Sequence, residues 1–341
     1  MKKTYIALKP FNNRVFYNNA VFNSSLPTSS PYLIAARKLL AKNNLIMDTI
    51  DIAPKTLTRK YIYLDVPYPW QLKLWIRLLK NISKNILFII EAPVVNPFSH
   101  TKLFHIFFKK IYTWNDDLVD NKKYFKFVIP KSSKGIDTKT ISFKKKEFLT
   151  MMNGNWLPFF PFRLLSLSTK ELYSKRIKAI EFFDKNIPLD FSLFGRGWNK
   201  PQKYSIKQRL FGYHRYKTFR GEFNAKEKYA ILSRFKYALC FENSKITGYI
   251  SEKIFDCFKA KCVPVYYGAP NIDKYIPPNC YIDARNFDNY QALYDHLKNI
   301  REKEYNIYID RIQTLLKNRE FLQRWFERGF SILLLKLIKE K

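Results

Sequence analysis

A polar loop near the middle of the second half of the chain holds the residues best suited to chemistry. It reads FENSKITGYISEK from Phe241 to Lys253, follows the apolar run Tyr237–Cys240 and leads into a helical pattern over Ile254–Lys259. In α/β proteins a Gly-containing loop between a buried strand and a helix N-terminus is a common phosphate site. The loop ends in an adjacent acid and base, Glu252 and Lys253. The apolar strand Cys262–Pro270 follows the helix, and we predict that this β-loop-α-β unit holds a nucleotide-sugar.

Two further residues could take part in a transfer reaction. Glu91 directly follows the continuous apolar run Asn85–Ile90, which is typical of a strand buried on both faces. Its carboxylate is then expected at the carboxyl end of that strand, where α/β sheets bind ligands. Arg176, together with Lys253, could neutralise a diphosphate. Taken alone, each of these charged residues also suits a solvated surface position, and at this point both interpretations stay open.

Sequence signals for several other chemistries are absent. The four histidines have no metal-ligand spacing, and HxxxH and HExxH do not occur. The sequence has no Asp-x-Asp, the divalent-cation clamp of one large class of sugar transferases, and no GxGxxG or GxxxxGK[ST]. These absences argue against dehydrogenase and P-loop enzymes. They favour a diphosphate site that needs no obligatory metal, so the predicted set of metal ligands is empty.

Alternating strand and helix patterns surround these residues. In the first half we expect strands at 4–8, 45–52, 61–66, 85–90 and 124–129 and helices at 29–42, 69–82 and 102–110. In the second half we expect strands at 148–152, 189–194, 237–240 and 262–270. We expect helices there at 170–185 and 254–259. Two more helices are expected, one capped by Asn224 and running to 235, the other capped by Asp288 and running to 300. The rest of the chain reads as helix.

This alternation predicts an α/β fold with two Rossmann-like halves and a helical C-terminus. A Lys-rich polar stretch over 131–146 marks the boundary. The predicted divisions are 1–138, 139–310 and a C-terminal helical segment 311–341. A cleft between the carboxyl ends of the two sheets would bind the ligand.

The stretch FENSKITGYISEKIFDCFKAKCVPVYYGAP resembles glycosyltransferase family 10, the α-1,3-fucosyltransferases. The family pattern has the form F-E-N-S/T, a short loop, G/D-Y-V/I-T/S-E-K and a P-V/I-Y/V-x-G strand. The similarity extends back through LFGRG at 193–197 to Arg176, and Glu91-Ala92-Pro93 resembles the family's E-S-P element. The family's V-P-Y-G element is incomplete, because Pro130 is followed by Lys131. Residues 1 to 80 are not covered.

The resemblance implies a GT-B enzyme that moves L-fucose from GDP-fucose to a glycan hydroxyl in an α-1,3-type linkage, with inversion and without an obligatory metal or other cofactor. It implies that Glu91 is the general base and that Arg176 and Lys253 stabilise the GDP leaving group. Glu252 would hold the ribose, and Asn243 and Tyr249 would line the nucleotide pocket. The acceptor, a lipid-linked or lipopolysaccharide chain among others, and an α-1,4 linkage are left open.

Composition bears on partners and location. The net charge is +33, with 61 Lys and Arg against 28 Asp and Glu, while 47% of the residues are hydrophobic. The excess charge favours anionic partners, although a Lys-rich composition can also reflect an AT-rich genome. The four cysteines form no CxxC pair and lie in or beside apolar runs, so we expect buried free thiols in a reducing compartment. No signal-peptide core or 20-residue apolar run is present, which predicts a cytoplasmic protein.

The basic, apolar C-terminal stretch FLQRWFERGFSILLLKLIKEK suits either an interfacial membrane helix or a helix packed on the domains. We expect peripheral contact with an anionic inner membrane. Two alternatives to the fucosyltransferase hypothesis are kept. One is the same fold with another GDP-sugar donor. The other, suggested by charge alone, is a nucleic-acid- or lipid-binding protein. The basic residues of this protein are spread along the whole chain, and no RNA- or DNA-binding motif occurs. Nucleic acid is therefore not an expected partner.

Overall fold

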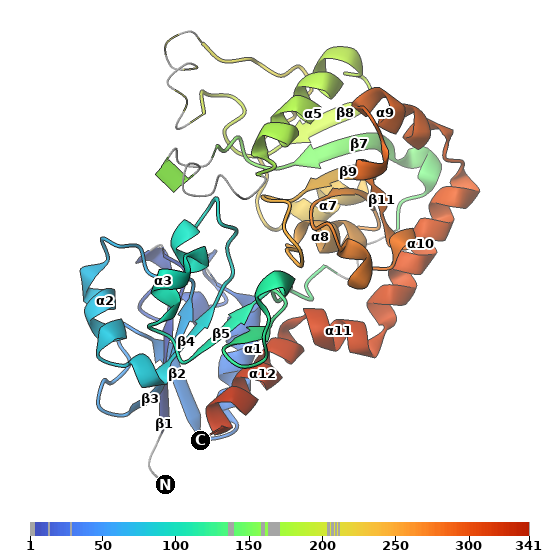
Figure 1. The fold of residues 1–341 in the computed structure, drawn as a ribbon. Helices are drawn as coiled ribbons and strands as arrows, with labels where there is room; N and C mark the ends of the chain where they lie inside the picture. The colour runs from blue at the N-terminus through green and yellow to red at the C-terminus, as the bar shows by residue number, and fades with distance from the viewer. Residues whose placement is uncertain are drawn as a thin grey trace. The chain divides into compact units, whose positions relative to one another are not determined.

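The chain folds into two compact α/β units, seen in Figure 1. The computed structural model describes every residue except 1–3, 13, 28, 136–139, 158–160, 163–170, 203–204, 206–207, 209, 211 and 341. One unit comprises Met1–Ser133 together with Arg319–Lys341, and the other comprises Lys134–Asn318. The boundary expected at 138/139 and the helix start expected at residue 170 both lie outside the described residues.

The first unit is built on a six-stranded parallel sheet in the order β2-β1-β3-β4-β5-β6. Its strands are β1 (Thr4–Lys9), β2 (Leu45–Thr49), β3 (Thr58–Leu64), β4 (Asn85–Phe88), β5 (Lys110–Thr113) and β6 (Tyr124–Lys126). Its helices before the boundary are α1 (Pro31–Ala41), α2 (Leu72–Leu79) and α3 (Lys102–His105). The expected helix over 102–110 is wrong in its second half, because Lys110 already belongs to β5, which pairs with both β4 and β6.

The second unit contains a five-stranded parallel sheet in the order β11-β10-β9-β7-β8. Its strands are β7 (Glu147–Met152), β8 (Phe191–Phe194), β9 (Phe235–Phe241), β10 (Val263–Tyr267) and β11 (Ile282–Asp283). The helices are α5 (Tyr173–Asn186), α7 (Lys228–Ser233), α8 (Lys253–Lys259), α9 (Tyr290–Asn299) and α10 (Glu302–Lys317).

Two expected helix caps in this unit are wrong. Asn224 accepts hydrogen bonds from the backbone N–H groups of Lys226 and Glu227, which places it in the turn before α7 rather than at its cap. The cap of α9 is Asn289, not Asp288, because the Asn289 side chain accepts from the Ala292 N–H at 2.8 Å.

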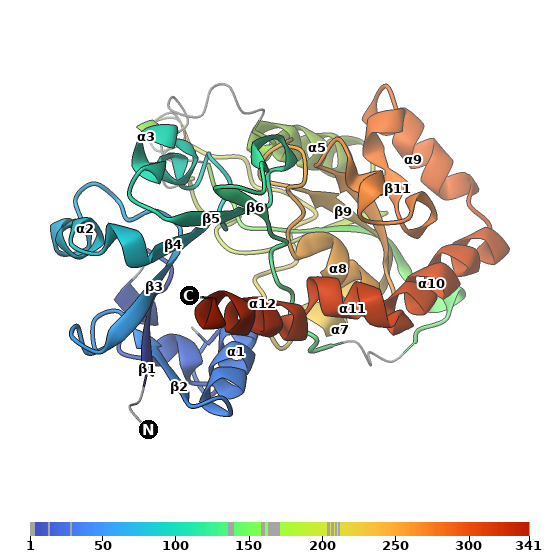
Figure 2. The same ribbon diagram turned by 60° about the horizontal axis from the view of Figure 1, so that its bottom comes forward.

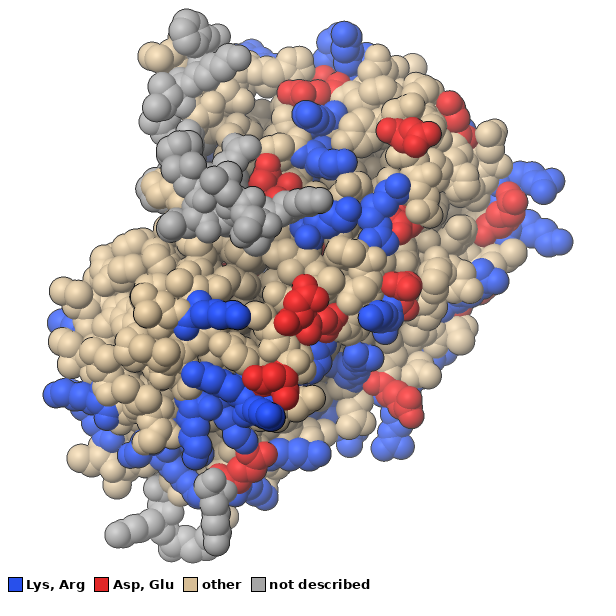
Figure 3. Space-filling view, viewed as in Figure 1, with Lys and Arg blue, Asp and Glu red and all other residues tan. Residues whose placement is uncertain are grey.

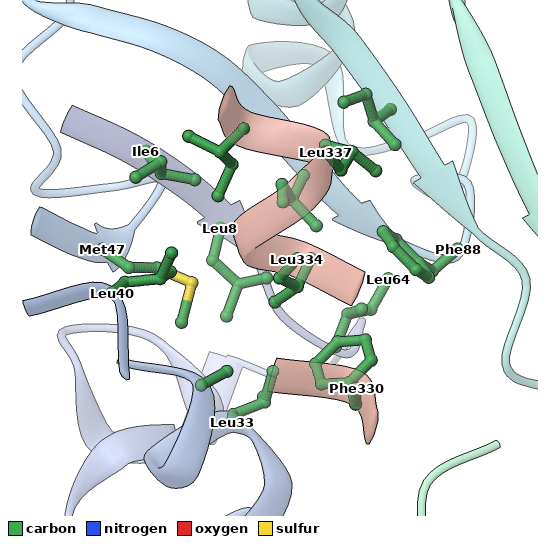
Figure 4. Packing of buried hydrophobic residues seen from close by; sticks show 14 of the residues in the cluster. Ile6, Leu8, Leu33, Leu40, Met47, Leu64, Phe88, Phe330, Leu334 and Leu337 are labelled. Atoms are coloured by element: carbon green, nitrogen blue, oxygen red, sulfur yellow. The ribbon is translucent and has the colours of Figure 1, made fainter. Parts of the chain in front are cut away.

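The last two helices, α11 (Arg319–Trp325) and α12 (Glu327–Lys339), belong to the first unit. Figures 1 and 2 both place α12 beside α1. Phe330, Leu334 and Leu337 of α12 pack in the same buried cluster as Leu8 and Phe88 of the sheet, as Figure 4 shows. The apolar side of α12 is therefore used for packing within this unit. Among the described residues, no helix is both long and apolar enough to cross a membrane.

Because all strands within a sheet are parallel, their carboxyl ends lie along one edge of each unit. In the first unit this edge carries Glu91, three residues beyond the end of β4. In the second it carries the loop from Glu242 to Glu252, which connects β9 to α8. Parallel α/β sheets bind ligands at this edge, so both expected functional regions occur where such a site belongs.

Candidate functional site

The loop after β9 is closed by a buried carboxylate. Glu242 is fully buried; its Oε1 accepts from the Ser251 N–H at 2.8 Å and its Oε2 accepts from the Ser251 hydroxyl at 2.6 Å. The Glu242 N–H donates to the carbonyl of Tyr267 on β10 at 2.8 Å. A Cβ on Gly268 would lie 2.5 Å from Glu242 Cγ, so only glycine fits beside this carboxylate. Glu242 thus joins the two ends of the loop.

Arg176 reaches the same loop from α5. Its side chain is buried, and its Nε and Nη2 donate to the carbonyl of Phe241 at 3.1 and 2.8 Å. Nη2 also donates to Asn243 Oδ1 at 2.6 Å, and the guanidinium lies 4.6 Å from the ring centroid of Tyr173. The arginine is therefore held by contacts on several sides where β9 ends, with its charge next to the start of the loop.

Lys253 and Glu252 lie at the other end of the loop. The Lys253 ammonium donates to the Ser251 hydroxyl at 3.0 Å and lies 3.5 Å from Glu242 Oε2. The Glu252 side chain is 56% exposed and lies 3.9 Å from the same ammonium. Helix α8 begins at Lys253 and is only seven residues long. The charge of Lys253, more than the helix N-terminus, is what this end of the loop offers to an anion.

A cavity of about 430 Å³ in the second unit brings most of the expected donor-binding residues together. Arg176, Asn243, Glu252 and Lys253 all line it. Tyr249 is buried and is not among the lining residues, so its role in a nucleotide pocket stays a prediction.

The cavity also contains charged residues that sequence reasoning missed. Asp256 and Lys228 line it and form an ion pair at 2.5 Å. The position of Asp256 one helical turn after Glu252 and Lys253 would have placed it on the same side of α8. Lys228 carries no comparable signal, because it comes from a separate helix. With two lysines and an arginine against two carboxylates, the lining suits a charged, polar ligand such as a nucleoside diphosphate.

In the first unit, the main chain at Glu91 is held from both sides. Asp65, buried and in the left-handed region at φ 61°, accepts from the N–H groups of Ile90 at 2.9 Å and Glu91 at 3.2 Å. The ring of His100 lies on the other side, with Nε2 2.9 Å from the carbonyl oxygen of Glu91. Glu91 itself is half-buried. The backbone that carries this carboxylate is therefore fixed by side chains from two different segments.

The groups around Glu91 have shifted pKa values because they are removed from water. Burial lowers the pKa of His100 to about 4, which keeps the ring neutral and able to donate from Nε2 to the Glu91 carbonyl. Burial also raises the pKa of Asp65 and lowers that of the fully buried Lys9 to about 7, while their mutual attraction opposes both shifts. Lys9 Nζ donates to the carbonyls of Leu64 and Asp65 at 2.8 and 3.1 Å.

Within the part of the chain that the structure describes, no three His, Cys, Asp or Glu side chains come together as a metal site would require. All four cysteines are buried and free, as the sequence predicted; Cys240 and Cys257 line the cavity with their sulfur atoms 3.2 Å apart.

Comparison with known proteins identifies what the second unit is similar to. Residues 164–325 match the family model for glycosyltransferase family 10 (fucosyltransferase), C-terminal part. An alpha-(1,3)-fucosyltransferase of Helicobacter pylori is 34% identical over 88 residues, which cover 26% of this chain and 18% of that protein. A GDP-fucose protein O-fucosyltransferase 3 of Xenopus tropicalis is 31% identical over 106 residues, 30% of this chain and 22% of the relative. The chain thus matches about a fifth of the length of these relatives.

Solved structures resemble the whole chain at low sequence identity. An alpha1,3-fucosyltransferase structure aligns with a TM-score of 0.55 at 14% identity, covering 99% of this chain and 90% of that one. An alpha-glucosyltransferase in complex with UDP-glucose and DNA aligns with a TM-score of 0.57 at 9% identity and 99% coverage of both chains. The fold is therefore the GT-B type. Since the two neighbours score alike, the fold alone does not select a donor.

Proposed function

Because the chain carries a family 10 fucosyltransferase domain over residues 164–325, we propose that it transfers L-fucose from GDP-fucose to a hydroxyl of a glycan acceptor. The anomeric centre is inverted and the linkage is of the α-1,3 type. The observation that carries the proposal is the cavity at the carboxyl edge of the second sheet. It gathers Arg176, Asn243, Glu252 and Lys253, the residues that match the family motif, in one place.

In the proposed reaction this cavity holds the donor. As the bond between fucose and the β-phosphate breaks, negative charge develops on the departing GDP. Arg176 and Lys253 stabilise that charge electrostatically, which is the contribution a bound metal makes in other transferases. Both cations are already oriented, Arg176 by Phe241 and Asn243 and Lys253 by Ser251. In this proposal Glu252, whose side chain is largely exposed, accepts hydrogen bonds from the ribose hydroxyls.

Glu91 acts as the general base in this proposal. Direct displacement with inversion requires one group to remove the proton of the acceptor hydroxyl as that oxygen attacks the sugar. Glu91 follows a buried strand, matches the family's E-S-P element and has its main chain held by Asp65 and His100. A carboxylate on a fixed backbone loses little freedom when it takes up its catalytic position.

Replacement of Glu91 tests the assignment of the base. Glu91→Gln keeps the size and polarity of the side chain but removes the proton acceptor. We expect fucose transfer to fall by roughly 10²- to 10⁴-fold, while the affinity for GDP, measured by calorimetry, stays unchanged. Turnover close to that of the unaltered protein would remove Glu91 from the role of base, and loss of GDP binding would indicate a structural role.

The donor, the metal requirement and the acceptor need separate assays. Thermal-shift titration with GDP-fucose, GDP-mannose and UDP-glucose distinguishes the fucose donor from another GDP-sugar. Transfer assays with and without EDTA test the metal-free mechanism, which strong inhibition would contradict.

A glycan array supplemented with folded protein acceptors tests the glycan assignment, because one relative carries the name of a protein O-fucosyltransferase. Transfer to protein hydroxyls alone would overturn the proposed acceptor class.

A further inference from the structure

A large apolar surface lies on α2 and α3 of the first unit. Seven large hydrophobic side chains in this region are between 42% and 68% exposed: Trp70, Leu72, Ile76, Leu79, Ile82, Leu103 and Ile106. They make up nearly half of the exposed large hydrophobic residues found in the described part of the chain, yet they lie within 37 positions of the sequence. Soluble proteins rarely expose so many neighbouring apolar residues without a partner.

The arrangement of α2 explains the surface. Leu72, Ile76 and Leu79 recur at helical spacing, so they form a single apolar stripe along this helix, and that stripe faces solvent. Among the residues of α2, only Leu78 is buried. The helix therefore has apolar residues on two sides: Leu78 and the partly buried Trp75 pack on the protein, and the stripe of Leu72, Ile76 and Leu79 faces solvent.

Helix α3 extends the same surface. Trp75 of α2 packs against Phe104 and Phe107 with ring centroids 5.4 and 5.7 Å apart. This contact joins the two helices, so that Leu103 and Ile106 continue the exposed apolar area of α2. In Figure 3 the part of the first unit that carries α2 and α3 is mostly uncharged, with lysine and arginine side chains around it.

The charges around this surface are basic. Lys73, Lys80, Lys84, Lys102 and Lys109 are exposed, and Arg77 also lies on α2. Between residues 66 and 115 the chain has a single acidic residue, Glu91, on the carboxyl edge of the sheet. A further acidic residue, Asp51, lines a cavity together with Leu72. Exposed leucine, isoleucine and tryptophan surrounded by lysine and arginine are the features of a helix that lies in the interface of an anionic bilayer.

We propose that the α2–α3 surface docks the protein on an anionic lipid membrane. Leu72, Ile76, Leu79 and Leu103 enter the boundary between headgroups and acyl chains, Trp70 lies at headgroup level, and the lysines contact anionic headgroups. Self-association through the same surface is disfavoured, because it would bring two clusters of lysine and arginine together. The proposal does not depend on the enzymatic function, and it assigns membrane contact to α2 and α3 rather than to α12, whose apolar side is buried.

Vesicle binding by the full chain tests the proposal without donor or acceptor. Co-sedimentation is measured with vesicles of phosphatidylcholine alone and with vesicles that also contain the anionic lipid phosphatidylglycerol. We expect binding to the anionic vesicles that weakens as salt is raised from about 0.05 to 0.5 M. The variant Leu72→Ser/Ile76→Ser/Leu103→Ser should bind at least about tenfold more weakly.

A matched control variant distinguishes binding through this surface from non-specific hydrophobic adsorption to vesicles. Leu189→Ser/Leu210→Ser/Ile307→Ser removes three exposed aliphatic side chains from the second unit and should bind vesicles as the unaltered protein does. Because all six residues are exposed, circular dichroism should show both variants folded. Equal binding by the two variants, or no binding to anionic vesicles, would overturn the proposal. Sedimentation velocity that shows a dimer dissolved by the α2–α3 variant would assign the surface to a second copy instead.

Discussion

At the scale of single residues, the carboxylate of Glu91 and the cations of the donor cavity are held in different ways. Glu91 is fixed through its backbone, by Asp65 and His100. Arg176 and Lys253 are fixed through their own polar atoms, by Phe241, Asn243 and Ser251. The first arrangement fixes the main chain that carries the Glu91 carboxylate. The second pre-orients positive charge for a leaving group.

Lys253 should contribute to the rate more than to donor affinity. Removing its charge in Lys253→Ala leaves the developing charge on the β-phosphate less stabilised, and we expect kcat for transfer to fall by roughly 10²- to 10³-fold. The KM for GDP-fucose should change much less. Lys245→Ala, in the same loop but not among the residues that line the cavity, serves as the control and should retain activity. A change confined to KM would mean that Lys253 binds donor and transition state equally.

Stability should depend on pH through His100. Its pKa is about 4 in the folded protein against an ordinary value of 6.5, so the unfolded chain binds the proton more readily. The stabilising contribution is complete above pH 6.5 and is lost as the pH falls toward 4, by at most roughly 3 kcal/mol. Urea unfolding from pH 4 to 7 measures this slope.

The variant His100→Gln, which can still donate to the Glu91 carbonyl but does not titrate, should show a flatter dependence of unfolding free energy on pH. Some slope should remain, because burial also lowers the pKa of His105. An unchanged slope in the variant would show that His100 does not cause it.

Residue types near the motif could be predicted from the sequence, whereas partners from distant segments could not. Arg176, Asn243, Glu252 and Lys253 do line one cavity. Asp65 was not recognised, because its link to Glu91 spans 26 positions and depends on the pairing of β3 with β4. The ion pair of Lys228 with Asp256 depends in the same way on contacts between helices.

At the scale of elements, the loop between β9 and α8 depends on close packing against the end of β10. A Cβ on Gly268 would meet Tyr266 Oη at 2.4 Å and Glu242 Cγ at 2.5 Å. The strand and the helix start could be read from apolar runs and charge. The glycine after β10 belongs to the family pattern, but the contacts with Tyr266 and Glu242 that require it are seen only in the folded structure.

Gly268→Ala should therefore disturb the loop as well as stability. We expect a loss of about 1 to 3 kcal/mol in the free energy of unfolding and a higher KM for GDP-fucose, because Glu242 must move and it holds Ser251. Gly212→Ala is the comparison: its φ of 84° strains alanine, which does not apply at Gly268, but nothing lies within 4 Å of the added carbon. Chemical denaturation and donor kinetics on both variants measure the difference, and a KM raised equally in both would contradict the proposed cause.

At the scale of the whole molecule, each compact unit has its own parallel sheet and core, as the alternating patterns predicted. The sequence left open whether the apolar face of the last helix contacts a membrane or packs on the protein. The structure places it against α1 and the first sheet (Figure 4). Periodicity identifies an apolar face but not what covers it, and for the same reason it did not reveal that the stripe on α2 is exposed.

Truncation of a buried residue in α12 should destabilise the first unit. Leu334 is fully buried in the cluster shared with Leu8 and Phe88, so Leu334→Ala should cost roughly 2 to 5 kcal/mol. Leu72→Ala removes the same atoms from an exposed position and should change the unfolding free energy by less than about 0.5 kcal/mol. Denaturant unfolding compares the two, and equal effects would contradict the packing of α12.

The position of α12 in the chain also has a consequence for biosynthesis. The second unit is continuous in sequence and can complete its core as soon as its own residues leave the ribosome. The first unit is made earlier but lacks Phe330, Leu334 and Leu337 until the whole second unit has been made. At roughly 5 to 20 residues per second, its unfilled core waits about 10 to 40 s for them. During that interval the emerging chain exposes a surface for chaperones, and the unit made first completes its core after the second unit.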